Sequence, residues 1–370
     1  MFAPHDAADG ALARIRLPGG VISSAALRVV AEAAEELGDG HVHLTSRGNL
    51  QLRGLSRTSD LTTRLAAAGL LPSATHERVR NVLASPLSGI AGGLVDVRGL
   101  AAALDRGLRA RPELAELPGR FLFALDDGRG DVAAEGSDLC WRAGSLLIAG
   151  VDTGWGIDAA DAVAVLLDAA EEFLALRAAD GGTAWRVAEL AHGPVRIAAA
   201  LNLPMQESHF HATSLRKRGF PATAAAVPGP VRRDDGGTAL VAAAVLGELT
   251  ADQVQLLADA DAEVVVTPWR TVVLPNPRVP AAALAAAGLV VAPGPAAEVS
   301  ACAGRPGCAK ALADVRADAR AVLEHLPPGR IHVSGCARRC GAPRAAHVDA
   351  VALPGGGYDV DGVPCPGLVP

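Results

Sequence analysis

The sequence predicts an α+β protein in which one β-α-β-β-α unit occurs twice, with a longer segment after each copy. Strand-like and helix-like runs alternate in the same order in both copies, and a turn falls at the same place in each. Clusters of Gly and Pro at 228–230, 234–237 and 293–295 separate the parts. We therefore expect two halves built on one plan.

The first copy begins with a strand and ends with a helix. In order, it contains a strand at 11–17, a helix at 24–37, strands at 41–44 and 50–53, and a helix at 58–68. A turn around Arg47-Gly48-Asn49 joins the two central strands.

The second copy repeats this order about two hundred residues later. It contains a strand at 238–245, a helix at 250–260, strands at 262–267 and 271–274, and a helix at 280–287. Its turn is Pro268-Trp269-Arg270. Alanine-rich windows such as 159–177 predict ordinary amphipathic helices rather than partner-binding faces.

Composition limits where the protein works and what it binds. Half of the 370 residues are hydrophobic and the mean hydropathy is +0.27, but no run approaches the roughly 18–20 apolar residues of a membrane-spanning helix. The first residues lack the basic and apolar regions of a signal peptide. We expect a cytoplasmic protein that does not contact membranes.

The charge balance argues against a nucleic-acid partner. The net charge is −6, the isoelectric point is near 5.9, and aromatic residues make up only 3% of the chain. An anionic ligand must therefore meet a local basic pocket.

Four of the six cysteines lie close together near the C-terminus, spaced as C-x5-C, then 27 residues, then C-x3-C. They are Cys302, Cys308, Cys336 and Cys340. Thiolates favour iron–sulfur clusters or zinc, and zinc ribbons normally use tighter C-x2-4-C pairs. The spacing predicts a [4Fe-4S] cluster, with zinc or four reduced core cysteines as the alternatives. Cys140 and Cys365 are expected to be plain thiols.

The residues around these cysteines also favour a cluster. Residues 303–307 form a small, turn-rich loop, and a helix predicted at 309–325 would direct its positive N-terminal end at a thiolate-bound centre. A predicted strand at 331–333 leads into Ser334-Gly335-Cys336, where Gly lets backbone amides approach sulfur.

Several motifs together carry a resemblance to a known family. "HLTSRGNLQLRG" (43–54), "RNVLASPLSG" (80–89), "LPGRF" (117–121), "CAGRPGC" and "SGCARRC" occur in this order. The chain resembles the sirohaem-type sulfite and nitrite reductase superfamily, and within it the precorrin-3B synthases of aerobic cobalamin biosynthesis.

The resemblance implies duplicated ferredoxin-like half-domains and two nitrite/sulfite reductase-type [4Fe-4S] lobes related by pseudo-two-fold symmetry. The expected segments are half-domain 1 at 10–74, lobe 1 at 75–230, half-domain 2 at 231–295 and the cluster-binding lobe 2 at 296–370.

The resemblance also implies roles for single residues. In the reductases, the cysteine that matches Cys340 bridges to the sirohaem iron. Arg47 and Arg80 match arginines that face the anionic ligand, whereas Asn81, Gln51 and Gly54 match motif positions whose role can be structural.

The chain departs from the reductases at a lysine pair. Where those enzymes carry two lysines in a Leu-Pro-x-Lys-Phe-Lys run, this chain has Arg120 and Leu122. Arginine does not readily release a proton near neutral pH, and leucine has none to give. Six-electron reduction with repeated protonation is therefore disfavoured, while binding of an acidic macrocycle is retained.

The implied reaction is an oxygen-dependent monooxygenation. Precorrin-3A is hydroxylated at C20 with one atom of O2, and a peripheral acetate closes into a lactone, which yields precorrin-3B. Guanidinium groups bind carboxylates in a bidentate manner. The candidates for substrate binding are Arg47, Arg53, Arg78, Arg80 and Arg120, each with a solvated surface arginine as the alternative.

The resemblance implies a second metal, a mononuclear non-haem iron, or sirohaem in the reductases. The sequence does not identify its ligands. His209 and His211 alternate along the chain, as do His41 and His43, but polar loop or core histidines are the simpler interpretation.

No Gly-x-Gly-x-x-Gly fingerprint follows a strand, so we expect an external electron donor, either an NADH-linked reductase or a ferredoxin. We expect the protein itself to be a monomer.

Three other functions stay open at this stage. The first is a small sirohaem-dependent sulfite or nitrite reductase, and the second is a non-catalytic tetrapyrrole carrier. The third is a zinc-stabilised structural protein.

Overall fold

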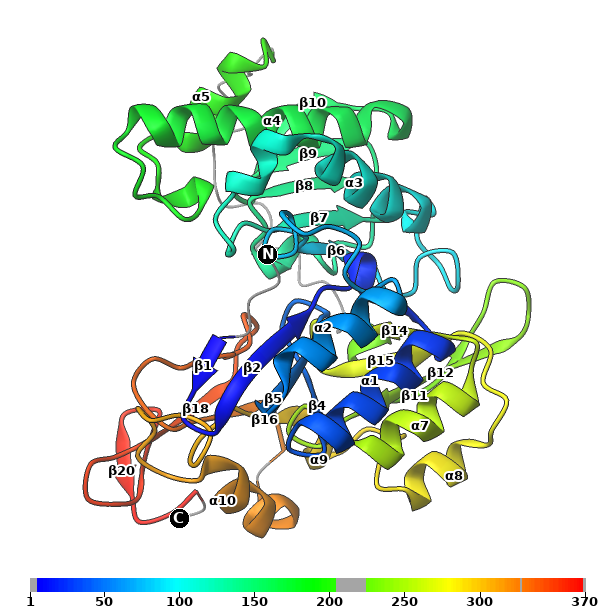
Figure 1. The fold of residues 1–370 in the computed structure, drawn as a ribbon, viewed down its shortest axis with the longest axis vertical. Coiled ribbons are helices and arrows are strands. Elements are labelled where there is room, and N and C mark those ends of the chain that lie inside the picture. The colour runs from blue at the N-terminus through cyan, green and yellow to red at the C-terminus, as the bar shows by residue number, and fades with distance from the viewer. Residues whose placement is uncertain (1–4, 204–223, 327, 369–370) are drawn as a thin grey trace. The chain divides into compact units, whose positions relative to one another are not determined.

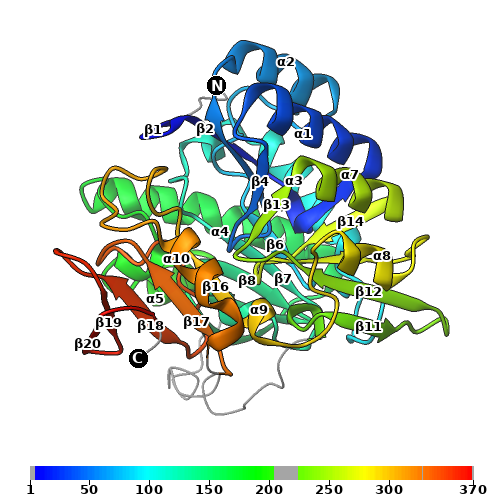
Figure 2. The ribbon, with the colours of Figure 1, turned by 90° about the horizontal axis from the view of Figure 1, so that it is seen from below.

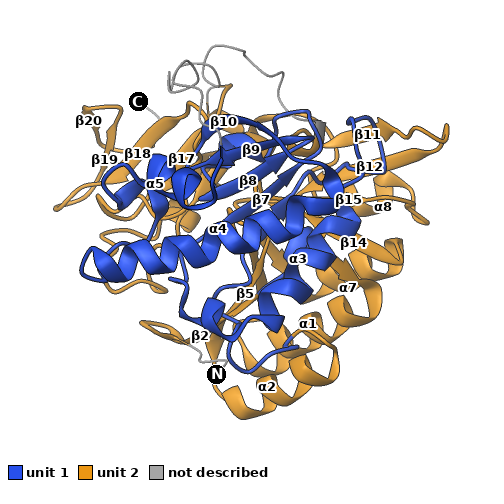
Figure 3. Cartoon of the chain, turned by 90° about the horizontal axis from the view of Figure 1, so that it is seen from above, with its two compact units in different colours: residues 1–2, 16–21, 71–223 blue, residues 3–15, 22–70, 224–370 orange. Residues whose placement is uncertain are grey.

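The computed structural model describes residues 5–203, 224–326 and 328–368, which form two compact units (Figures 1 and 3). Unit 1 contains residues 16–21 and the chain from 71 to 203, and unit 2 contains the remaining described residues. No helix of the described residues is long and apolar enough to cross a membrane.

Unit 2 contains two five-stranded sheets with the same plan. The first has the order β1-β2-β5-β4-β13 and the second the order β11-β12-β15-β14-β3. The first sheet consists of β1 (His5–Ala7), β2 (Gly10–Ile15), β5 (Leu50–Leu55), β4 (His41–Leu44) and β13 (Glu248–Thr250). The second consists of β11 (Gly229–Arg232), β12 (Thr238–Ala243), β15 (Thr271–Leu274), β14 (Glu263–Val266) and β3 (Val21–Ser23).

The two half-domains exchange their edge strands. β13 comes from the second half and pairs antiparallel with β4, while β3 comes from the first half and lies beside β14. Matching backbone bonds follow the two exchanged strands, from Ser24 N–H to the Ala262 carbonyl at 2.9 Å and from Ala251 N–H to the Gly40 carbonyl at 3.0 Å. Each sheet is therefore complete only when both halves are present.

The exchanged strands lead directly into the helices that pack the halves together. α1 (Ser24–Leu37) and α7 (Ala251–Ala260) lie side by side (Figure 1), and their buried faces are rich in alanine, which permits close approach. Each half also carries a second helix, α2 (Thr58–Ala67) or α8 (Ala281–Ala286). The predicted duplication is confirmed, and the predicted strands and helices of both copies agree with the structure to within a few residues.

Unit 1 contains a third sheet, with the order β10-β9-β8-β7-β6, in which the first three strands in sequence are parallel and the next two antiparallel. Its strands are β6 (Val82–Ala84), β7 (Phe123–Asp126), β8 (Leu139–Arg142), β9 (Ser145–Ile148) and β10 (Val151–Gly156). Its helices are α3 (Arg98–Ala110), α4 (Ala159–Ala179) and α5 (Gly193–Ala200). The core is built around the buried rings of Phe121, Phe123 and Phe173.

A fourth sheet repeats this plan in unit 2, with the order β16-β17-β18-β19-β20 and the same strand directions. It consists of β16 (Val299–Ala301), β17 (Ile331–Ser334), β18 (Val348–Ala352), β19 (Tyr358–Val360) and β20 (Val363–Cys365). α9 (Pro295–Glu298) precedes it, and α10 (Val315–Val322) packs on β16 and β17 (Figure 2). The duplication therefore extends to the segments that follow each half-domain.

The helix predicted at 309–325 is wrong at its start. α10 begins at Val315, where the Asp314 carboxylate accepts a hydrogen bond from Ala317 N–H at 3.1 Å. The preceding residues bond to the cysteine loops instead, since Leu312 N–H donates to the Gly335 carbonyl at 2.7 Å and the Ala313 carbonyl accepts from Arg305 N–H at 2.9 Å. The N-terminus of the helix therefore does not follow Cys308 directly.

The N-cap of α7, which ends the exchanged strand β13, can be tested by substitution. Thr250 ends β13, its hydroxyl accepts from Gln253 N–H at 3.2 Å, and the Gln253 side chain accepts from Thr250 N–H at 2.9 Å. We expect Thr250→Ala to lower the free energy of unfolding by about 1 kcal/mol, measured by chemical denaturation, because the capping box is lost. Thr250→Ser keeps the hydroxyl, so equal losses in both variants would contradict this role.

Candidate metal centre and substrate-binding residues

The four clustered cysteines lie together in unit 2. Cys302 directly follows β16 and Cys336 lies just beyond β17, so both occupy the carboxyl ends of parallel strands. The pKa of the Cys340 thiol is raised by burial and then by the charges of Cys302, Cys336 and Cys308. The other three thiols therefore lie within electrostatic reach of Cys340, which is the most exposed of the four.

Backbone hydrogen bonds hold the first of these sulfurs. Gly335 N–H donates to Cys302 Sγ at 3.2 Å, and Cys302 N–H donates to the Val333 carbonyl at 3.0 Å. N–H donors to sulfur are one of the means by which a protein sets the potential of an iron–sulfur cluster.

The spacing of the sulfurs bears on the choice of metal. Four thiolates bound to one zinc ion at about 2.3 Å are about 3.8 Å apart. Within the described parts of the chain, the groups of three or more metal-ligating side chains whose ligand atoms lie within 4.8 Å of one another do not include these cysteines. No three of these four sulfurs therefore lie within 4.8 Å of one another in the described chain.

Lobe 1 reproduces the same backbone geometry without thiols. Ser85 follows β6 as Cys302 follows β16, and Ser85 N–H donates to the Leu125 carbonyl at 3.0 Å. Asp127 N–H then donates to Ser85 Oγ at 3.1 Å, as Gly335 N–H does to Cys302 Sγ. Ser85 is therefore the counterpart of Cys302 in the other copy of the lobe.

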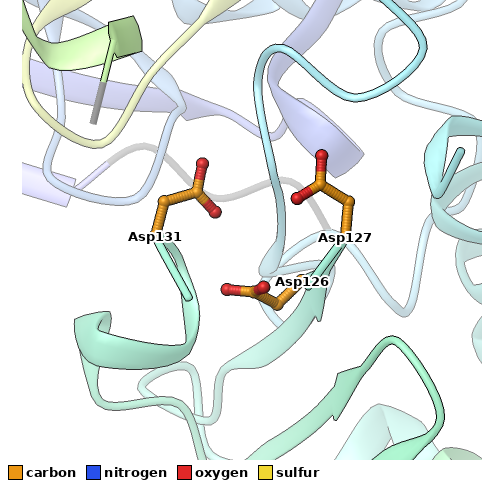
Figure 4. Close-up of side chains that lie close together, drawn as sticks. All are labelled: Asp126, Asp127 and Asp131. Atoms are coloured by element: carbon orange, nitrogen blue, oxygen red, sulfur yellow. The ribbon is translucent and has the colours of Figure 1, made fainter. Parts of the chain in front are cut away.

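Carboxylates gather at this place in lobe 1. Asp126, Asp127 and Asp131 are buried and direct ligand oxygens at one another within 4.8 Å (Figure 4). Asp126 accepts three backbone N–H bonds, and Arg129 binds both oxygens of Asp127. Burial, and then the charge of Asp126, raise the pKa of Asp131 to about 7, although its carboxylate accepts from the Ser85 hydroxyl at 2.6 Å.

Arg53, a substrate candidate, is neither solvated nor open to substrate. It is 6% exposed, binds Asp9 through two bonds of 2.9 Å, and donates to the Gly307 carbonyl at 2.5 Å, beside Cys308. Its guanidinium therefore ties half-domain 1 to the first cysteine loop.

Arg316 makes a second tie between the half-domains and the cysteines. It donates to the Cys302 carbonyl at 3.2 Å and to Glu248, on β13, at 2.6 Å. His43 Nδ1 lies 2.9 Å from the same guanidinium, and His43 Nε2 lies 3.4 Å from Asp39. Burial is the largest of several causes that lower the pKa of His43. Both ring nitrogens of His43 therefore belong to this polar network.

The remaining substrate candidates of unit 2 are Arg47 and Gln51. Arg47 is half-buried in the turn between β4 and β5, and Gln51 lies on β5 opposite His43. His41 lies on β4, with Nδ1 2.9 Å from the Asp39 carbonyl. His209 and His211 lie outside the described residues.

In unit 1, Arg80 is fully engaged by carboxylates. It is 4% exposed and binds Asp105 at 2.6 Å and Glu77 at 3.1 Å. Arg78 and Arg120, by contrast, are exposed. Leu122 is buried in the core of lobe 1, so the second lysine position of the reductases has become a packing position here.

Asn81 holds the loop that carries Arg120. Its side-chain amide donates to the carbonyls of Arg78, Gly119 and Phe121 at 3.1–3.3 Å. Two of these carbonyls flank Arg120 directly. Asn81 is fully buried, which makes it a structural support for the loop.

Known proteins with this arrangement identify the family. The profile of the nitrite/sulfite reductase ferredoxin-like half domain matches residues 5–64. A precorrin-3B synthase from a Sinorhizobium species is 30% identical to this chain over 385 aligned residues, which cover 95% of the chain and 80% of that protein. The chain belongs to the precorrin-3B synthase family. This membership covers both half-domains and both lobes.

Reductases resemble this member of the precorrin-3B synthase family over less of its length. A ferredoxin–nitrite reductase of Leptolyngbya laminosa is 36% identical over 138 residues, which cover 35% of this chain and 27% of that enzyme. The chain thus spans about a quarter of that relative. The structure of the Mycobacterium tuberculosis NirA protein matches 90% of this chain and 69% of its own, with a TM-score of 0.71 and 20% identity. The duplicated nitrite/sulfite reductase-type fold is thereby established.

Sequence reasoning missed the residues that support the cysteine loops. Asp9, Glu248 and Arg316 are distant from the cysteines or from one another in the sequence, and no motif marks them.

Asn81 can be tested by truncation. We expect Asn81→Ala to lower the free energy of unfolding by about 1–3 kcal/mol, because three carbonyls, of which that of Phe121 is buried, lose their donor. Chemical denaturation would measure this loss. Glu35→Ala, at an exposed position on α1, should change stability by less than about 0.5 kcal/mol. An equally small effect at Asn81 would contradict the supporting role.

Asp131 predicts a pH dependence of stability. Its folded pKa of about 7 exceeds the usual value of 3.8, so between these values the folded chain holds a proton that the unfolded chain has released. This group therefore removes stability as pH rises from about 4 to 7, by at most about 1.4 kcal/mol per pH unit. The free energy of unfolding of Asp131→Asn, relative to that of the wild type, should therefore increase as the pH rises from 5 to 7. It should stay constant above pH 7.

The matched control for this titration is Asp96→Asn. Hydrogen bonds with Arg98 lower the pKa of Asp96, so this group changes the free energy of unfolding only below about pH 4. Denaturation curves at pH 5, 6, 7 and 8 should show a constant difference for this variant. A constant difference for Asp131→Asn as well would contradict the raised pKa.

Proposed function

We propose that this protein catalyses the oxygen-dependent conversion of precorrin-3A to precorrin-3B in cobalamin biosynthesis. The observation that carries the proposal is the family membership, because the alignment to a precorrin-3B synthase covers 95% of the chain. The reaction adds one oxygen atom of O2 at C20 and closes a peripheral acetate into a lactone.

The cysteine set supports a [4Fe-4S] cluster held by Cys302, Cys308, Cys336 and Cys340. Three of the thiols lie within electrostatic reach of Cys340, and a backbone N–H already donates to Cys302 Sγ. When bound, the cluster supplies one-electron transfer, and a separate mononuclear iron supplies dioxygen activation. The ligands of that second iron are not assigned.

Arginines support recognition of a polycarboxylate. The chain has a net charge of −6, so substrate binding depends on local cations. We assign direct carboxylate binding to Arg47 and Arg120, with Gln51 as a neutral hydrogen-bonding partner. Arg80 and Asn81, which are buried and internally bonded, would act by holding the loops of lobe 1 in place.

A sirohaem-dependent sulfite or nitrite reductase is the second candidate function. The partial match to a nitrite reductase favours it. The packing of Leu122 argues against it, because a side chain that supplied protons in the reductases has become part of an apolar core. Electrons would come from an external reductase or ferredoxin in either case.

The test begins with anaerobic purification of the full chain, followed by iron and sulfide analysis and a visible spectrum. We expect about four iron atoms in a cluster plus one more, and O2 uptake that depends on precorrin-3A. Cys336→Ser should lose most of the cluster absorption and the uptake. Cys365→Ser, outside the cysteine set, is the matched control and should keep both.

Three outcomes would reject the proposal. Sirohaem absorption with sulfite or nitrite reduction, and no O2 uptake, would assign the chain to the reductases. Tight binding of precorrin-3A without O2 uptake would make it a carrier. Bound zinc without iron or sulfide would make the cysteine site structural.

A further inference from the structure

We propose that Arg270 is a positioning residue, which holds the loop of Cys340 and supplies positive charge beside the cluster. This inference rests on the proposed function, because it assigns a role toward the proposed [4Fe-4S] cluster. Arg270 belongs to half-domain 2, in the turn between β14 and β15, and is far from Cys340 in sequence.

The duplicated turns show that this position normally suits glycine. In half-domain 1, Thr45 N–H bonds to the Asn49 carbonyl at 3.0 Å, and in half-domain 2, Thr267 N–H bonds to the Thr271 carbonyl at 3.0 Å. This register makes Gly48, at φ +61°, the counterpart of Arg270, at φ +62°. L-residues with side chains are disfavoured in this left-handed region. The arginine at this position therefore adopts a backbone conformation that glycine would adopt at lower cost.

The surrounding backbone makes room for that side chain. Gly247 lies under the stem, and a Cβ atom added there would come within 2.5 Å of Arg270 Cδ. At its far end, the guanidinium donates to the Gly341 carbonyl at 2.5 Å. The path of the side chain thus runs over a glycine to the residue that follows Cys340.

The contact has two consequences for the site. A charge-assisted hydrogen bond to the Gly341 carbonyl restricts the backbone next to the most exposed of the four cysteines. A fixed positive charge near an anionic cluster also favours the added electron, which raises the reduction potential. Arg53 and Arg316 donate in the same way to carbonyls at the first cysteine pair.

Arg270→Gly removes the side chain and keeps the conformation of the turn, because glycine suits φ +62° better than arginine does. We expect this variant to fold, with a thermal midpoint at or above that of the wild type. Hydrogen–deuterium exchange of the 338–342 amides should be about tenfold faster, and a redox titration followed by EPR should give a lower cluster potential. Arg270→Lys should restore part of the potential, because it keeps the charge.

Arg28→Gln is the matched control, because Arg28 lies on α1 and pairs with Asp259 on α7. It should leave both exchange and potential unchanged. Unchanged exchange and potential in Arg270→Gly would overturn the proposal, as would equal shifts in the control. Should the wild type bind no cluster, the proposed cofactor fails, while exchange of the 338–342 amides still tests the contact of Arg270 with the loop.

Discussion

The reciprocal exchange of β3 and β13 is the constraint on which the rest of unit 2 depends. Each sheet takes its last strand from the other half, and the helices that follow these strands, α1 and α7, pack against one another. β4 and β14 are therefore paired on both sides, and the short strands β13 and β3 form the edges of the two sheets. Glu248, on the exchanged strand β13, also meets Arg316. The same exchange that joins the half-domains therefore connects them to the cysteine loops.

The two lobes have the same backbone plan but carry different side chains at equivalent positions. The two lobes share strand order, strand directions and the hydrogen bond that follows the first strand. In one lobe that bond ends on Cys302, whose soft sulfur suits iron. In the other it ends on Ser85, beside a buried group of carboxylates, where hard oxygen atoms replace the thiols. The four-cysteine set thus occurs in only one of the two lobes.

Arginine has two separate roles in this protein. Arg53, Arg316 and Arg270 donate to backbone carbonyls at or beside three of the cysteines. Arg53 and Arg270 belong to the half-domains, whereas Arg316 lies on α10. Arg80 is held by Glu77 and Asp105 inside lobe 1. An arginine in a motif therefore does not by itself indicate substrate contact. Arg47, Arg78 and Arg120 remain the candidates for that role because the first is only half-buried and the other two are exposed.

Local patterns were sufficient for the elements of the two half-domains. Alternating apolar residues and turn signals predicted β4, β5, α1 and their second copies, because these depend on neighbours within a few residues. The strand exchange could not be predicted, since β3 and β13 are three-residue segments whose partners lie in the other half. The start of α10 was misplaced for the same reason, because Leu312 and Ala313 bond to distant cysteine loops rather than to a helix. Motifs selected Arg53 and Arg80, but only tertiary contacts decided that both are buried ion-paired supports, because a guanidinium takes its role from the carboxylates and carbonyls around it.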